Sequence, residues 1–163
     1  MAKGEWSQVA GVIHDSTNAW YTERGLPAIF HHGPQSTRLF CEVYEALDPG
    51  CCLIAEDCHT GRIAGSCFYH PRSTHISLGI MNVHPDCFGR GVARLLLESI
   101  TNIADEKCLP TRLVSSAINL DSFSLYSRGG FVPQYVYQDI LFTVPAEGLK
   151  CAPPRLASNV RPI

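Results

Sequence analysis

The chain has 163 residues, of which 45% are hydrophobic, and this suits a single domain with a substantial core. With 13 Lys and Arg against 15 Asp and Glu, the formal net charge is -2, so we expect no nucleic-acid partner. No apolar run approaches the roughly 20 residues that cross a bilayer, and the polar start over residues 1–5 differs from a signal peptide. We therefore expect a cytoplasmic protein with no membrane attachment.

Two helices are predicted in the first third of the chain, over residues 6–23 and 36–47, where apolar residues recur at helical spacing. Gly25 and Pro27 stop the first helix, and the second opens after a Gly-Pro turn and a Ser/Thr cap candidate. The apolar face of the first helix consists of Val9, Val12, Ile13 and Trp20.

Three strands follow, over residues 51–55, 63–69 and 77–84. The first two are joined by a hairpin at residues 57–61, and the third leads into a glycine-rich turn with Gly89 and Gly91. Such a turn lets the next helix point free N–H groups and its positive dipole end at an anion such as a pyrophosphate. A lone glycine pair is more often a plain strand-to-helix turn, so by itself it is a weak signal.

The helix after this turn is predicted over residues 91–107, with an apolar face that includes Val92, Leu96 and Ile100. A central strand is predicted over residues 112–118 and a short amphipathic helix over 120–128. One or two closing strands are predicted within residues 131–144, where Pro133 indicates an edge strand or a bulge.

Two segments together resemble the GNAT acetyltransferase superfamily. The first, Phe88-Gly89-Arg90-Gly91-Val92-Ala93, matches the family's acetyl-coenzyme A loop, although Phe88 stands where the family usually has a polar or basic residue. The second contains Asn119, Tyr126 seven residues later, and then Gly130-Phe131, as in the family's later motif. The resemblance covers residues 6–144 and is strongest over 80–131.

The resemblance implies an α/β (α+β) fold with a mixed, mostly antiparallel sheet flanked by about four helices. It also implies an acyltransferase, an N-acetyltransferase that uses acetyl-coenzyme A as cosubstrate and acts on a primary amine of a small molecule or a peptide. An alternative is a non-catalytic acyl-coenzyme A binding or interaction module. A phosphate-loop nucleotidase is disfavoured, because Lys and Ser/Thr do not follow Gly91.

The resemblance further implies roles for particular residues. The backbone of Met81, Asn82 and Val83 would pair with the pantetheine arm of the cosubstrate and donate an N–H to the thioester oxygen. Asn119 would bond this arm or cap the helix that follows it. Tyr126 would also touch the cosubstrate and act as general acid, because a phenol stays protonated at neutral pH. The pyrophosphate would be held by Gly89, Arg90, Gly91, Val92, Ala93 and Arg94.

A general base is harder to assign, because neither residues 74–84 nor residues 112–118 contain a carboxylate. His75 shares strand parity with Ser77 and Gly79, so it could face the cleft, and histidine is the side chain most often used as a base at neutral pH. His70 is a second choice, and a water relay could serve instead.

The acceptor pocket of this fold commonly involves the loop between the first two helices, which here contains His31 and His32. In a loop flanked by Gly and Pro, however, an exposed and incidental histidine pair is the favoured interpretation. Glu23 and Glu42 could steer a cationic amine, or they could be ordinary solvated helix charges.

The eight cysteines lack the dense spacing of a disulfide scaffold, and we expect mostly buried, reduced thiols. The segment with Cys51, Cys52, Cys58 and His59 could suggest zinc. Because adjacent strand residues point to opposite faces and no paired Cys-x-x-Cys exists, we expect no metal.

We expect an acetyltransferase domain over residues 1–146 and a linker or tail over 147–163. The ending Asn159-Val160-Arg161-Pro162-Ile163 resembles the family's usual first strand. It could begin a second domain of a tandem protein, fill the first-strand position in this chain or a neighbouring copy within a homodimer, or be a loose tail.

Overall fold

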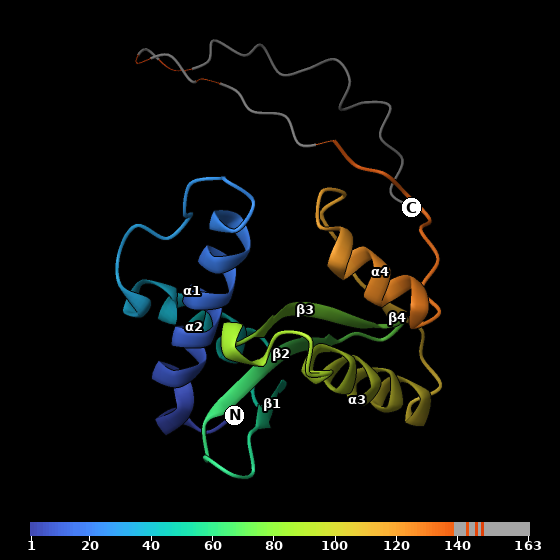
Figure 1. Cartoon of the computed structure of the whole chain (residues 1–163). Helices are drawn as coiled ribbons and strands as arrows, with labels where there is room; N and C mark the ends of the chain where they lie inside the picture. Colours follow the sequence, from blue (N-terminus) through green and yellow to red (C-terminus); the bar gives the residue numbers. More distant parts are fainter. Residues whose placement is uncertain (139–142, 144–145, 147, 149–163) are drawn as a thin grey trace. The chain divides into compact units, whose positions relative to one another are not determined.

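Figure 1 shows the computed structural model, which describes residues 1–138, 143, 146 and 148. The chain divides into two units, Met1–Phe131 and Val132–Ile163, and the fold below is that of the first unit. In the second unit, residues 132–138 contain no helix or strand. The strands predicted over 131–144 are therefore not formed in 131–138, and their remainder lies mostly outside the described residues, as do the predicted linker and the strand-like ending over 159–163.

The first unit contains four α-helices, and their extents follow the hydrophobic pattern closely. They are α1 (Trp6–Thr22), α2 (Arg38–Leu47), α3 (Val92–Glu106) and α4 (Leu120–Arg128). Three short 3₁₀ turns accompany them: η1 (Lys3–Glu5), η2 (Pro34–Thr37) and η3 (Pro85–Cys87).

A four-stranded sheet with the order β1-β2-β3-β4 forms the centre of the unit. Its strands are β1 (Cys52–Glu56), β2 (Ile63–Pro71), β3 (Ile76–Val83) and β4 (Thr111–Arg112). The first three strands pair antiparallel, whereas β3 and β4 pair in parallel. The predicted fold class, a mixed and mostly antiparallel sheet flanked by helices, is confirmed.

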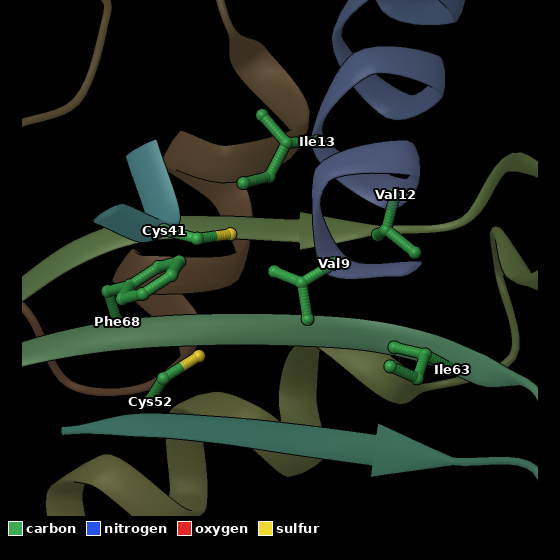
Figure 2. Close-up of a cluster of buried hydrophobic side chains, with 7 residues drawn as sticks. All are labelled: Val9, Val12, Ile13, Cys41, Cys52, Ile63 and Phe68. Carbon is green, nitrogen blue, oxygen red and sulfur yellow. The ribbon is translucent and has the colours of Figure 1, made fainter. Parts of the chain in front are cut away.

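Helices cover both faces of the sheet, because the strands alternate buried side chains between them. On β2, Phe68 faces the helices α1 and α2, while Cys67 faces α3. Figure 2 shows the first cluster, which contains Val9, Val12, Ile13, Cys41, Cys52, Ile63 and Phe68. The second cluster contains Cys67, Ile76, Leu78, Leu96, Leu97, Ile100 and Ala104.

Gly65 on β2 allows α3 to approach the sheet closely. A Cβ atom at this position would lie 2.9 Å from the Val92 Cγ1 atom and 2.9 Å from the Asn82 carbonyl oxygen. Such distances are too short for van der Waals contact, so a larger residue would push the start of α3 away from the end of β3. The glycine therefore sets where the first turn of α3 lies.

The predicted strand over residues 112–118 is wrong for most of its length. Only Thr111 and Arg112 pair with β3, opposite Ile76 and Ser77, and among the described residues no further strand partner extends this pairing. A strand needs hydrogen bonds to a neighbour, and residues 113–118 leave β3 instead of following it. The two strands thus diverge towards the end of β3.

The predicted cap of the second helix is also wrong. Helix α2 begins at Arg38 after η2, and the Thr37 side chain does not cap it. Instead, the Thr37 hydroxyl lies within hydrogen-bond distance of the Ala10 carbonyl oxygen of α1 at 2.7 Å and of the Pro34 carbonyl oxygen at 2.6 Å. This fully buried hydroxyl therefore ties α1 to the start of α2.

The substitution Thr37→Val tests this link. It keeps the shape of the side chain but removes the buried hydroxyl that bonds the backbone, so we expect the free energy of unfolding to fall by about 1–2 kcal/mol. Urea denaturation would measure this change. The control Thr22→Val removes an exposed hydroxyl bonded within α1 and should change stability by less than about 0.5 kcal/mol. Equal effects of both substitutions would contradict the link.

Candidate active site

A cavity of about 960 Å³ opens in the first unit where β3 and β4 diverge. Its walls are α1, the end of β3, the loop before α3, and the helices α3 and α4. The floor includes the buried Leu97 of α3. The cavity thus lies at the place where the sequence predicts the cosubstrate loop.

The loop before α3 has the backbone of an anion-binding turn. Gly89 and Gly91 have φ values of 72° and 83°, in the left-handed region that favours glycine, and both line the cavity. The Leu95 N–H is bonded to the Gly91 carbonyl at 3.0 Å, which leaves the N–H groups of the first turn, Val92 to Arg94, without partners inside the helix. These groups and the helix dipole favour a negative charge at this end of the cavity.

The space in front of the loop fits a phosphate group. A Cβ atom at Gly89 or Gly91 would meet no atom within 4 Å, so the space beside the backbone of both glycines is open. Val92, Ala93 and Arg94 also line the cavity. Arg94 lies at the rim, where its Nε atom is bonded to a Glu98 carboxylate oxygen at 2.7 Å.

Arg90, in contrast, does not line this cavity. Its guanidinium lies 3.6 Å from an Asp57 carboxylate oxygen in the β1–β2 hairpin and 3.8 Å from the Cys87 sulfur. The structure therefore brings together five of the six predicted pyrophosphate residues and places the Arg90 side chain beside the hairpin.

The end of β3 offers unpaired backbone to the cavity. Residues Met81, Asn82 and Val83 pair with β2 on one side, while on the other side the described pairing with β4 stops at Ser77. All three residues line the cavity, so a linear ligand has a strand edge to follow.

The Asn82 side chain also connects this strand to α1. Its Nδ2 atom donates to the Ser16 Oγ atom at 3.2 Å, and its Oδ1 atom is buried without a hydrogen-bond partner among the described residues. Ser16 is itself only 8% exposed and lines the cavity. The contact fixes α1 as the wall opposite the loop.

Asn119 lies in the cavity wall and caps α4. Its Oδ1 atom accepts a hydrogen bond from the Ser122 N–H at 3.1 Å, which satisfies one of the free donors at the helix start. The capping role predicted as one alternative is therefore present in the structure, and the side chain stands at the cavity as well.

Tyr126 packs in the second hydrophobic cluster, beneath the cavity. Its ring lies 5.9 Å from the Phe131 ring, and burial, with a smaller contribution from Cys67, raises the pKa of the phenol to about 12. Within the part of the chain that the structure describes, its hydroxyl has no hydrogen bond, and the side chain is not among those lining the cavity. The phenol is protonated at neutral pH, as a general acid must be, but it faces the core.

The two candidate bases lie away from the cavity lining. His75 precedes β3 and contacts Thr74, with 3.0 Å between its Nδ1 atom and the Thr74 hydroxyl. Six residues separate it from Met81, which corresponds to about 20 Å along a strand. His70 is bonded to Asp48 at 2.6 Å and packs on Tyr44. Neither imidazole is brought to the cavity in this structure.

The acceptor candidates are separated by the structure. His31 and His32 are exposed and do not line the cavity. Glu42 is paired with Arg38 on α2 at 3.1 Å, also outside the cavity. Glu23, at the end of α1, does line it.

Sequence reasoning missed most of the α1 wall of the cavity. The hydrophobic pattern predicts Trp20 on the apolar core face, yet it lines the cavity together with other residues one turn apart on the same side of the helix. The i, i+4 and i+7 spacing of polar and aromatic residues was the available signal. Arg128, in the last turn of α4, was also missed. The α1 wall consists of Ser16, Thr17, Trp20, Tyr21, Glu23 and Arg24.

The cysteines of the described residues form no disulfide. Burial raises the pKa of Cys41 to about 11 and that of Cys52 to about 12, whereas Cys58 is exposed in the hairpin. Within the described ranges, no three His, Cys, Asp or Glu side chains group as a metal site requires. No helix there has the length and apolar character to cross a membrane.

A family model for the acetyltransferase (GNAT) family matches residues 14–131. This range is more than half of the chain and contains both the glycine loop and the Asn119 to Phe131 motif, so the chain belongs to the GNAT acetyltransferase family. No curated protein matches it.

Solved structures share the fold at low sequence identity. A Pyrococcus horikoshii protein solved at 2.25 Å resolution has a TM-score of 0.66 and 18% identity, over 83% of this chain and 42% of that one. The ribosomal-protein-alanine N-acetyltransferase of Brucella melitensis biovar Abortus 2308 has a TM-score of 0.59 and 17% identity, over 87% and 96%. A transcriptional regulator of Bacillus halodurans C-125 has a TM-score of 0.61 and 16% identity, over 87% and 96%. At these identities the likeness concerns the fold alone.

The substitution Gly91→Ala tests the loop geometry. A Cβ atom meets no neighbour there, so the cost arises from the left-handed backbone and should lower the free energy of unfolding by about 1–2 kcal/mol. Thermal or urea denaturation would measure it. The control Gly11→Ala, also in open space but inside α1, should raise stability by about 0.5–1 kcal/mol. A stabilising Gly91→Ala would contradict the loop conformation.

Proposed function

We propose that this chain is an N-acetyltransferase that binds acetyl-coenzyme A in the cavity and uses a primary amine as acceptor. The observation that carries the proposal is the combination, in one cavity, of a left-handed glycine turn before α3 and an unpaired edge at the end of β3. The first suits a diphosphate and the second suits an extended arm with amide groups. Family membership supports the same cosubstrate.

Acetyl-coenzyme A, when bound, supplies a thioester whose carbonyl carbon accepts an amine. The residues of this chain bind and orient it: the first turn of α3 binds phosphate, with Arg94 and Arg128 adding positive charge, and the backbone of Met81 to Val83 pairs with the arm. Asn82 holds α1 in place through Ser16.

A proton must leave the amine and another must reach the departing sulfur. Tyr126 remains the proposed donor by its family position, and a modest rotation of α4 or of the side chain would have to bring its hydroxyl to the cavity. His75 lies too far along β3 to accept the amine proton directly, so water in the cavity is the proposed route.

The positions of Tyr126 and of the two candidate histidines favour a second function, a binding module without catalytic activity. With the Tyr126 phenol packed in the core and both candidate histidines outside the cavity lining, the chain could bind acyl-coenzyme A without turnover. The homodimer and tandem arrangements, and the domain boundary at residue 146, likewise stay predictions.

The substitution Tyr126→Phe distinguishes the two functions. Calorimetric titration with acetyl-coenzyme A would measure binding, and thiol release with a panel of primary amines would measure turnover. If Tyr126 is the general acid, we expect unchanged cosubstrate affinity and a loss of kcat of about 100-fold. Because burial raises the pKa of this phenol to about 12, its loss of a proton should not limit the rate below about pH 10.

The control is Tyr44→Phe, a half-buried tyrosine that packs on Phe68 outside the cavity. It should leave both binding and kcat unchanged. Equal kcat for Tyr126→Phe and the wild type would remove the general acid role. Binding of acetyl-coenzyme A without thiol release on any amine would show that the chain is a binding module and not a transferase. No binding would show that the cavity is not a site for this cosubstrate.

A further inference from the structure

The charged side chains of the cavity leave one residue of each sign without an ion-pair partner in the described part of the chain. Arg24 pairs with Asp121 at 2.5 Å, and Arg94 pairs with Glu98 at 2.7 Å. The two that remain are Glu23 and Arg128.

These two charges lie at different ends of the cavity. Asp121, in the first turn of α4, is held against Arg24, and Glu23 precedes Arg24 in the turn that follows α1. Arg128 lies in the last turn of α4, seven residues from Asp121, which corresponds to about 10 Å along a helix. One end of the cavity is therefore negative and the other positive.

The positive part suits the phosphates of the cosubstrate. It combines Arg128 and the first turn of α3, both of which favour negative charge. The end with Glu23 disfavours phosphate and favours a cation, because a carboxylate without a partner gains from a nearby positive charge. This end is therefore left for the acceptor.

The aromatic wall beside Glu23 binds a cation that belongs to the chain itself, which leaves the Glu23 carboxylate for a charge on the acceptor. The Trp20 and Tyr21 rings pack edge to face, with 4.9 Å between their centroids. The Arg24 guanidinium lies 4.3 Å from the Trp20 centroid, so this ring already holds one cation of the chain itself.

The geometry of α1 also gives a distance between the end of β3 and the Glu23 carboxylate. Ser16 touches Asn82 at the end of β3, the segment that we expect to bind the arm of the cosubstrate and its thioester oxygen. Glu23 follows Ser16 by seven residues, which is about 10 Å along α1. Resting on the proposed function, we infer that the acceptor is an amine with a second positive charge about 10 Å from the nitrogen that is acetylated, and that Glu23 binds this second charge.

The test compares three amines as acceptors in thiol-release assays with acetyl-coenzyme A. Octamethylenediamine has a second ammonium at a suitable distance, aminooctanol replaces that ammonium by a hydroxyl, and trimethylenediamine holds the second ammonium too close. We expect kcat/KM for octamethylenediamine to exceed that for either other amine by about fivefold, the upper range for an exposed ion pair. In Glu23→Gln the ratio should fall to about one.

The matched control is Glu42→Gln, which removes a carboxylate that pairs with Arg38 outside the cavity and should keep the fivefold ratio. A second readout needs no turnover: in calorimetric titration of octamethylenediamine into the full chain, Glu23→Gln should weaken Kd by about fivefold, while Glu42→Gln should not.

Three results would overturn the inference. Equal kcat/KM for octamethylenediamine and aminooctanol would show that a second positive charge on the acceptor does not matter, while the acetyltransferase function would still stand. A preference that survives in Glu23→Gln would remove Glu23 as its cause. Thiol release with none of the amines, together with unchanged diamine binding in Glu23→Gln, would remove both the inference and the transferase function.

Discussion

Close packing of α3 on β2 and β3 is the constraint on which the site depends. Gly65 has no side chain, so Val92 and Leu96 can lie against the strand, and the start of α3 is held next to the end of β3. The first-turn N–H groups and the strand edge consequently face one cavity. A side chain at position 65 would separate them, although neither group would change chemically.

The second feature on which the site depends is the short pairing between β3 and β4. Strands β3 and β4 share two residue pairs and then part. In a fully paired sheet the amide groups of Met81 to Val83 would be consumed by a neighbour. Their divergence instead leaves a polar edge between two hydrophobic clusters, where an extended ligand can replace the missing strand.

Periodicity predicted most of the fold, because α1 and α3 each bury one apolar face and the apolar residues of β1 to β3 fill both faces of the sheet. It failed for residues 113–118, where the apolar residues suit a strand but the pairing partner is lost. The glycine loop was predictable since left-handed backbone selects glycine. The directions of the Arg90 and Tyr126 side chains were not predictable. Arg90 turns towards Asp57, which is distant in sequence, and Tyr126 packs against Phe131 in the core. Family spacing located these residues without orienting them.

The ion pair between Arg24 and Asp121 joins the turn after α1 to α4, and both helices, although far apart in sequence, line the cavity. Both side chains are at least one-third exposed, so dissolved ions screen their attraction, which decays over about 8 Å at physiological ionic strength. The separation of the walls is then a property of the solvent as well as of the chain. Salt therefore weakens the link between these walls and, at the same time, the attraction of the positive end for an anion.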